Sequence, residues 1–280
     1  MKNFGDKLFE RVNHAKSALF IEGEMTQLSY ISYEKFIQLV EESKDEKHTL
    51  SYPVGYKADN TAINSTKDYT KQELIDRYKF LSLVKLPING IFQLITIMES
   101  LLGEIIREIL IEYPVKIPNR RKLDVETALG ANSLEEIKIS IVNSILNEIA
   151  YKSPKEFTAE FEKYVGVNLL EQPAYHRYIE VKATRDIHIH NSGIANEIYL
   201  AKAATLARVK NGIYLPVTIQ YFLQAYESCL QITEVLEVEL NKIWPSPLFN
   251  DRNKTVVPEK EKDEVVDEII KESKEESKSE

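Results

Sequence analysis

One stretch of regularly spaced apolar residues constrains the fold of this chain more than any other feature. Between residues 81 and 109, apolar side chains recur at alternating steps of three and four, while Glu99, Glu104 and Arg107 fall on other faces. This spacing places the apolar side chains on one side of an α-helix, which has to be buried against other elements. They are Leu81, Val84, Ile88, Ile91, Ile95, Met98, Leu102, Ile105 and Ile109. The pattern predicts a long core helix, with Pro87 either at its first position or at a bend.

Further amphipathic segments follow in the second half of the chain. Ser133 and Ser153 are each followed three residues later by Glu, which is the pattern of an N-terminal capping box. Pro173 starts another periodic segment, and Gly193 beyond it suits a left-handed C-terminal cap. Alternation typical of β-strands is confined to short pieces in residues 26–33 and 49–57. The sequence therefore predicts an all-α, up-and-down helical bundle with four to five core helices.

Changes in composition divide the chain into three parts. Residues 1–45 carry apolar residues at helical spacing in two pieces, and residues 49–71 combine Pro, Gly, Asn, Asp and Thr without apolar periodicity, as loops do. The last thirty residues carry mixed charge and no aromatic residue, too little apolar surface to offset the entropy of folding. We expect a helical N-terminal extension with a polar loop over residues 1–70, a helical domain over residues 71–247 and a disordered charged tail over residues 248–280.

Charge and cysteine content exclude several classes of protein. The net charge of −8 excludes a general nucleic-acid coat protein, because such a protein needs an excess of Lys and Arg to neutralise phosphates. The single cysteine, Cys229, cannot form an internal disulfide and lies on the apolar stripe of a predicted helix. The longest charge-free apolar stretch, Leu86 to Met98, is shorter than a membrane-spanning helix, and the N-terminus lacks the apolar core of a signal peptide. We expect a cytoplasmic protein without a membrane span.

A cluster of three histidines is the clearest candidate for chemistry. His176, His188 and His190 lie within fifteen residues of one another. A metal site made by His188 and His190 is not expected in a helix, because residues two apart point to opposite sides of it. The sequence also lacks a Gly-rich phosphate loop, a GxSxG motif and a CxxC pair. Neither a metal nor a cofactor is therefore predicted.

Arg185 and His190 offer a metal-free chemistry at the end of the same predicted helix. An imidazole can exchange a proton near neutral pH, and a guanidinium group binds phosphate with two parallel hydrogen bonds. Such a pair can cleave RNA, because the 2′-hydroxyl attacks the adjacent phosphate once a base removes its proton. The two side chains lie about 140° apart around one helix, so two copies meeting at a two-fold axis would be needed to complete a site. Asp186, one turn before His190, is close enough to hold its imidazole.

A structural interpretation competes with this chemistry. A histidine at a helix end often binds carbonyl groups or the helix dipole, and an arginine one turn earlier often pairs with a surface carboxylate. The basic loop that holds Arg120 and Arg121 would guide RNA if it reaches the cleft, and an ordinary solvated loop is the other interpretation of its composition. We take Arg185, His190 and Asp186 as the catalytic candidates. The substrate-binding candidates are His188, Asn191, Lys182, Arg120 and Arg121.

The chain resembles the HEPN superfamily (higher eukaryotes and prokaryotes nucleotide-binding) over roughly residues 78–245. The likeness rests on the segments MESLLGEIIREILIEYP, SLEEIKISIVNSILNEIAYKSPKEF and, above all, RDIHIHNSGIANEIYL. The last segment is similar to the family's Arg-x4-6-His pattern, with a polar residue after the Arg and Asn-x-Gly after the His. The resemblance implies that Arg185 binds phosphate, His190 acts as acid and base, and Asp186 supports both. His188 departs from the aliphatic residue that is commoner at its position.

The resemblance also implies an activity and partners. Members of the family form four- to five-helix bundles and homodimers whose motifs face each other, and they cleave RNA without a metal to leave a 2′,3′-cyclic phosphate. We therefore expect a homodimeric endoribonuclease in phage defence, a toxin–antitoxin pair or a stress response, with an antitoxin or another defence protein as a further partner. The alternative is a noncatalytic HEPN module that dimerises, docks a partner or binds a nucleotide.

Overall fold

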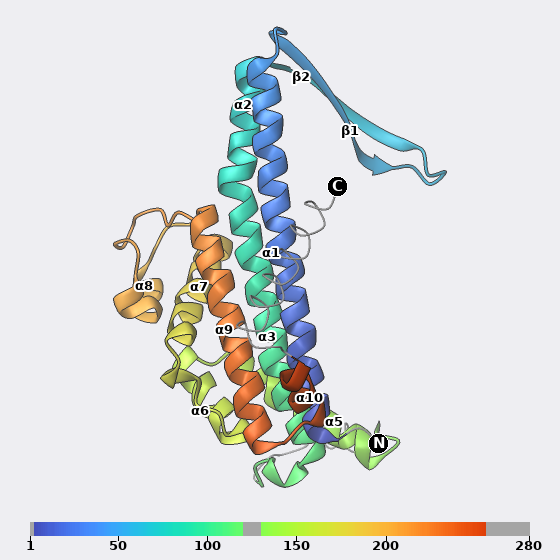
Figure 1. Ribbon diagram of the computed structural model, residues 1–280, viewed down its shortest axis with the longest axis vertical. Coiled ribbons are helices and arrows are strands. Elements are labelled where there is room, and N and C mark those ends of the chain that lie inside the picture. Colours follow the sequence, from blue (N-terminus) through green and yellow to red (C-terminus); the bar gives the residue numbers. More distant parts are fainter. Residues whose placement is uncertain (1–2, 120–129, 256–280) are drawn as a thin grey trace, which may run out of the picture.

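The three longest helices among the described residues lie side by side and form the frame of the molecule. The computed structural model describes residues 3–119 and 130–255. Helices α1 (Phe4–Glu42), α3 (Leu86–Glu112) and α9 (Ile219–Ile243) contact one another, as Figure 1 shows. The prediction of an all-α helical bundle is confirmed.

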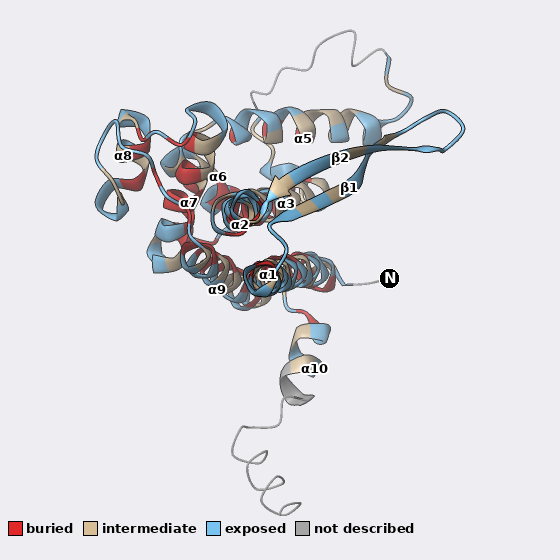
Figure 2. Ribbon diagram, turned by 90° about the horizontal axis from the view of Figure 1, so that it is seen from above, coloured by how far each residue is buried: buried red, intermediate tan, exposed pale blue. Residues whose placement is uncertain are grey.

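Shorter helices complete the bundle around α3 and α9. Helices α5, α6 and α7 contact α3, and α8 contacts α7. Their bounds are Leu134–Ala150 (α5), Pro154–Val165 (α6), Pro173–His190 (α7) and Glu197–Ala203 (α8), with short 3-10 turns at Pro114–Lys116, Leu169–Glu171 and Ala204–Leu206. The main core draws apolar residues from α1, α3, α5, α6, α7 and α9, and Figure 2 shows buried residues on the facing sides of these helices.

The two predicted serine caps form in different ways. Ser153 accepts a hydrogen bond from the backbone N–H of Glu156, whose carboxylate accepts one from the Ser153 N–H, so the capping box of α6 is confirmed. Ser133 likewise accepts from the N–H of Glu136. The Glu136 carboxylate, however, accepts from the backbone N–H of Asn132, at 2.7 Å. Both helices begin where the sequence predicts, and the second box reaches one residue further back.

The predicted core helix is part of one continuous helix from Lys71 to Glu112. It comprises α2 (Lys71–Phe80), a π-helical turn (Leu81–Lys85) and α3. Pro87 has no backbone N–H to donate one turn back, and the wider π-helical turn immediately precedes it. The stripe from Ile88 to Ile109 is buried as predicted. This helix is long and apolar enough to cross a membrane by length and composition, but the buried side of α3 forms the centre of the bundle core.

Helix α1 belongs to the bundle, although residues 1–70 were expected to form a separate extension. It is one helix of 39 residues rather than the two predicted pieces. Leu8, Val12 and Leu19 are buried in the same core as α3 and α9. The apolar spacing of these residues was recognised correctly, but spacing does not identify the partner that a helix packs against.

A β-hairpin replaces the loop that was predicted between residues 49 and 71. Strands β1 (Lys47–Tyr56) and β2 (Ala62–Thr70) pair in antiparallel fashion, with an irregular register between Pro53 and Gly55. Hydroxyl groups link the strands, since Thr49 bonds to Asp68 at 2.6 Å and the Ser51 and Thr66 hydroxyls lie 3.0 Å apart. Neither strand contains a buried residue, which explains why apolar periodicity gave no signal. The strand piece predicted at 49–57 is confirmed, and the piece at 26–33 is helical instead.

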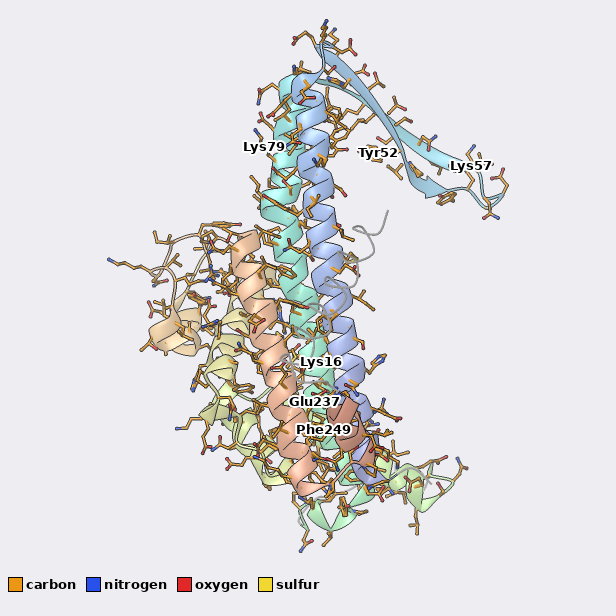
Figure 3. All side chains as sticks on the ribbon, viewed as in Figure 1. Lys16, Tyr52, Lys57, Lys79, Glu237 and Phe249 are labelled. Atoms are coloured by element: carbon orange, nitrogen blue, oxygen red, sulfur yellow. The ribbon has the colours of Figure 1, made fainter. Side chains whose placement is uncertain are left out.

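The segment predicted as a tail begins with another helix, α10 (Pro247–Thr255). It packs against the start of α1, where the rings of Phe9 and Phe249 lie 5.8 Å apart. The Ser246 hydroxyl donates to the Asp6 carboxylate at 2.6 Å, immediately before α10. Figure 3 shows Phe249 at this junction, close to Lys16 and Glu237 of the neighbouring helices. The remainder of the predicted disordered tail, residues 256–280, lies outside the described residues.

Candidate functional site

Helix α7 ends in a tight turn that fixes the position of the candidate motif. The backbone N–H groups of Asn191 and Gly193 both donate to the carbonyl of Ile187. Gly193 has a φ of +79°, so the left-handed cap predicted there is confirmed. A Cβ atom on Gly193 would lie 2.5 Å from the ring of Tyr214, so glycine is needed for space as well as for conformation. The chain therefore reverses directly after His190.

Arg185 points from α7 toward α3 and is held there by acidic groups. Its Nη2 atom lies 2.7 Å from a carboxylate oxygen of Glu99, and its Nη1 atom lies 3.4 Å from Asp186. The other Glu99 oxygen binds Lys182 at 2.7 Å, so one carboxylate holds two cations. The Nε atom of Arg185 is buried and has no hydrogen-bond partner among the described residues. A phosphate would have to compete with Glu99 for both cations.

His190 lies on a different side of α7, where its side chain is exposed. It lines a groove of 320 Å³ between α7 and α8, together with Asp186, Asn191 and Lys202. Arg185 does not line this groove. The divergence of Arg185 and His190 agrees with the angle that the helix geometry predicts, and within one chain the two side chains do not meet.

Asp186 connects the two sides of the helix end. One of its oxygens faces Arg185, and the other accepts a hydrogen bond from Lys202 at 3.1 Å. The sequence had suggested that Asp186 holds the imidazole of His190. Instead, the contacts of Asp186 in the structure go to Arg185 and Lys202, while His190 lines the same groove nearby. Lys202 was not among the predicted site residues, because its sequence neighbourhood is an ordinary amphipathic helix.

His188 faces the loop that follows α8. Its Nε2 atom lies 2.9 Å from the Leu215 carbonyl and so donates a proton to it, and its ring lies edge-on to Tyr214 at 5.7 Å. Burial lowers the pKa of His188 below the ordinary value for histidine, and the hydrogen bond to Leu215 opposes that effect only partly. The neutral form is therefore favoured at pH 7. This nitrogen is already used within the chain, and a contact of His188 with substrate stays a prediction.

Of the remaining candidates, only Asn191 belongs to the lining of the groove among the described residues. Asn191 donates from its side-chain amide to the Ile194 carbonyl and so closes the turn. His176 lies 2.9 Å from the Leu170 carbonyl, at the other end of α7. Arg120 and Arg121 lie outside the described residues. Within residues 3–119 and 130–255, no three His, Cys, Asp or Glu side chains come together in an arrangement that could hold a metal ion.

A buried charged network next to the groove was missed by the sequence reasoning. Glu180 is 2% exposed, and its carboxylate accepts hydrogen bonds from Tyr221 at 2.6 Å, from Tyr199 at 2.9 Å and from Arg208 at 3.1 Å. Thr184, one turn later on α7, donates to the same carboxylate at 2.9 Å. A signal was present, because Glu180 and Thr184 are four apart and flank residues on the predicted buried stripe.

This network holds the segment after α8 against α7 and α9. The Arg208 guanidinium lies 3.6 Å from the centre of the Tyr221 ring and also donates to the carbonyl of Pro216. Burial raises the pKa of Tyr199 to about 12 and that of Tyr221 well above its usual value, so both phenols stay protonated as donors. The network fixes α8, and with it the Lys202 wall of the groove.

Two other features surround the motif helix. Cys229 is buried in α9, as its place on the apolar stripe indicates, and burial raises the pKa of its thiol to about 12, which disfavours the reactive thiolate. A cavity of 440 Å³ lies between α3, α5, α6 and α7 and is lined in part by Gly103, Arg107, Tyr178 and Lys182. Because Lys182 also binds Glu99, this cavity adjoins the ion pairs of Arg185.

Comparisons with known proteins return no match for this chain. No family model matches it, and neither a curated protein nor a solved structure does. The chemistry of the α7 terminus therefore has to be inferred from its own residues and geometry.

Proposed function

We propose that this protein is a homodimeric, metal-independent endoribonuclease of the HEPN type. One observation carries the proposal: the exposed imidazole of His190 shares a groove with the carboxylate of Asp186 and the ammonium group of Lys202. A proton-transfer group and a cation are thus available on one accessible surface, which is what cleavage of an RNA phosphodiester requires. The likeness of the RDIHIHNSG segment to the HEPN motif supplies the substrate class.

In the proposed reaction, the imidazole of His190 removes the proton of a ribose 2′-hydroxyl. The 2′-oxygen then forms a bond to the adjacent phosphorus, and the bond from phosphorus to the 5′-oxygen breaks. A protonated imidazole, that of the partner subunit's His190, donates the proton that the leaving 5′-oxygen needs. The products are a 2′,3′-cyclic phosphate and a 5′-hydroxyl end, and no redox step or metal-bound water takes part.

Cations stabilise the charge that develops on the phosphate. Lys202 already lines the groove, and Arg185 lies one residue before Asp186 on the adjacent face of α7. In this proposal, the phosphate displaces Glu99 from Arg185 when RNA binds. The Arg185 side chain is only 19% exposed, so it is already held in place and loses little rotational freedom when it binds phosphate.

Exposed apolar residues around the motif suit the proposed dimer. Ile189, Ile194 and Ile198 are 48%, 36% and 65% exposed, and all three lie within nine residues of His190. Apolar side chains grouped around a polar centre are typical of protein interfaces. A two-fold axis near this surface would bring two copies of His190 and Arg185 to one substrate groove.

The cellular setting follows from the resemblance alone. We place the activity in the cytoplasm, in phage defence, in a toxin–antitoxin pair or in a stress response, with an antitoxin or another defence protein as a partner.

The proposal is tested by RNA cleavage with the purified full-length protein in EDTA. The wild type should cut single-stranded RNA to products with 2′,3′-cyclic phosphate ends, detected by mass spectrometry. His190→Ala should reduce the rate by at least 10²-fold, the contribution usual for a general acid or base, while the circular dichroism spectrum stays unchanged. His176→Ala is the control, because it removes an exposed histidine from the opposite end of α7. Activity that needs an added metal, or that survives His190→Ala, contradicts the proposal.

A specific observation favours a second candidate, a noncatalytic HEPN module that docks a partner or binds a nucleotide. Arg185 and Lys182 are both already paired with Glu99, as expected for charges that only stabilise a surface. Such a module would leave RNA intact. A nucleotide-binding form would show saturable binding of a nucleotide that Arg185→Ala abolishes, without turnover.

A further inference from the structure

The upper half of α1 leaves the bundle and forms an arm with α2. Figure 1 shows these two helices extending beyond the other helices, with the hairpin at their tip. The inner side of the arm has its own small core of Ile37, Val40, Leu74 and Ile75. Figure 3 places Lys79 on this arm, and Tyr52 and Lys57 on the hairpin that connects α1 to α2. A pair of helices with so small a core gains little from burial inside one chain.

The outer side of the same stretch of α1 carries large apolar residues that are exposed. Ile21, Met25, Leu28 and Leu39 are 64%, 54%, 57% and 66% exposed. Ile31, next to this line, is 50% exposed, whereas Phe20 lies on the side toward α9, where its ring is edge-on to Tyr226 at 6.4 Å. Apolar side chains on a helix surface are usually isolated, and several large ones on one helix face mark an interaction surface.

The spacing of this row is that of a coiled-coil seam. Ile21, Met25, Leu28, Ser32, Lys35 and Leu39 follow one another at steps of four, three, four, three and four. These are alternating a and d positions of a heptad repeat, which face a second helix rather than solvent. The seam covers 19 residues of helix, and its first and last positions lie about 27 Å apart at a rise of 1.5 Å per residue.

We propose that the outer face of α1 binds the same face of a second copy of this chain, with the two helices antiparallel. A two-fold axis beside residue 30 then sets Ile21 opposite the partner's Leu39, and Leu28 opposite the partner's Ser32. Each layer pairs an a position with a d position, as an antiparallel two-helix seam requires. Two such arms together form a four-helix bundle, which buries the rows that each arm leaves exposed.

Charge selects the antiparallel orientation. Glu24 and Lys35 are both exposed on the outer side of α1. In the antiparallel register, Glu24 of each copy lies beside the partner's Lys35, and the two-fold axis makes this contact twice. In a parallel, in-register pair, Lys35 would face Lys35 within the seam, and Glu24 would lie near Glu24. Like charges at these positions disfavour a coiled-coil pairing, whereas opposite charges specify it.

This surface is distinct from the motif of the proposed nuclease, so the inference goes beyond that function. Helices α3 and α9 lie between α1 and α7, as Figure 2 shows from above. If the chain pairs through the outer face of α1 and also through the motif surface at the end of α7, it has two different two-fold contacts. Closed symmetry with two such contacts gives a tetramer. A chain that uses the arm alone gives a dimer.

The test is the oligomeric state of the full-length protein, measured by light scattering after gel filtration and by sedimentation velocity. The wild type should be a dimer or a tetramer at micromolar concentration. Leu28→Glu should halve the particle mass, with a melting temperature and circular dichroism spectrum close to those of the wild type. Leu134→Glu is the matched control, since Leu134 is 84% exposed on α5, away from the arm, and this variant should keep the wild-type mass.

A charge exchange tests the register. Glu24→Lys places a lysine beside the partner's Lys35 and should weaken assembly about tenfold or more in dissociation constant. Adding Lys35→Glu restores opposite charges only if the helices run antiparallel with this register, so the double variant should recover the wild-type affinity. A monomeric wild type at 100 μM, an unchanged mass for Leu28→Glu, or a double variant no tighter than Glu24→Lys alone overturns the proposal. RNA cleavage by these variants is measured separately. The particle mass reports only on the arm, so it stays informative even if the protein does not cleave RNA.

Discussion

Helix α7 carries two charged clusters that differ in burial, and the contrast separates structure from candidate function. The cluster around Glu180 is buried, and its carboxylate is surrounded by two phenols, a hydroxyl group and a guanidinium group. The cluster around Asp186 is partly exposed, and its ion pairs connect side chains at the surface of the helix end. In the first cluster both carboxylate oxygens are hydrogen-bonded within the chain, whereas the second cluster adjoins a groove.

The difference shows what burial does to the same chemical groups. A buried carboxylate must be satisfied at once by fixed partners, because an unpaired charge in the interior is very costly. A partly exposed ion pair contributes less to stability than a buried one, so its partners can be exchanged for those of a substrate. On this argument, Glu180 and Arg208 hold the site together, and Asp186, Arg185 and Lys202 are the groups that can respond to RNA.

Removal of the buried carboxylate should have the largest effect on stability. Glu180→Ala leaves the Arg208 guanidinium partly buried without its anion, and Tyr199 and Tyr221 lose an acceptor. We expect a loss of about 3 kcal/mol in the free energy of unfolding, the lower end of the range for breaking a buried ion pair. Urea denaturation followed by circular dichroism measures this loss in the free energy of unfolding.

A matched control for this prediction is Glu239→Ala. Glu239 binds Lys242 at 2.7 Å on the surface of α9, where the Lys242 side chain is exposed and that of Glu239 is partly exposed. Its loss should cost less than about 1 kcal/mol. If the two variants are equally stable, the Glu180 network does not have the structural role assigned to it.

The sequence revealed the motif helix but not the groups around it. The apolar stripe of α3, the start of α7 at Pro173 and the turn at Gly193 follow from local signals, and the structure has all three. Glu99 and Arg208 reach α7 from distant parts of the chain, and single-sequence periodicity contains no information on such pairs. The divergence of Arg185 from His190 could be predicted, because it depends on the helix angle alone.

The errors in the fold have the same origin. The periodicity of α1 was visible, but its assignment to a separate extension required knowledge of its packing partner. The hairpin is held by cross-strand hydroxyl contacts and has no buried face, so its residues have the composition of a loop. Local patterns therefore predict elements well when one face is buried, and poorly when solvent surrounds the element.

Substitution of Glu99 tests whether the exposed cluster can be exchanged for substrate. Glu99→Gln removes the anion between Lys182 and Arg185, and because the pair is partly solvated, the stability should fall by less than about 1 kcal/mol. If Arg185 binds phosphate, RNA affinity should rise severalfold, measured by fluorescence anisotropy in the His190→Ala background.

Glu104→Gln provides the control on the same helix. It removes the same charge, but Glu104 binds Arg107 and not Arg185. Both variants make the protein more positive by one unit, so a general electrostatic effect would raise RNA affinity equally in each. Equal affinities would mean that Glu99 does not restrain a phosphate-binding group, and they would favour the noncatalytic candidate.

The smallest effect concerns pH and the loop beside the groove. The folded state favours neutral His188, because burial lowers its pKa below that of the unfolded chain. The unfolded state therefore binds more protons in acid, so this contribution to stability is complete above about pH 6.5 and is lost as the pH falls through the lowered pKa of the folded state. His188→Gln keeps an amide donor for the Leu215 carbonyl but cannot titrate. The free energy of unfolding should change less between pH 7 and pH 5 for this variant than for the wild type. If the change is the same for both proteins, the folded state accommodates charged His188 as well as neutral His188, and the prediction is wrong.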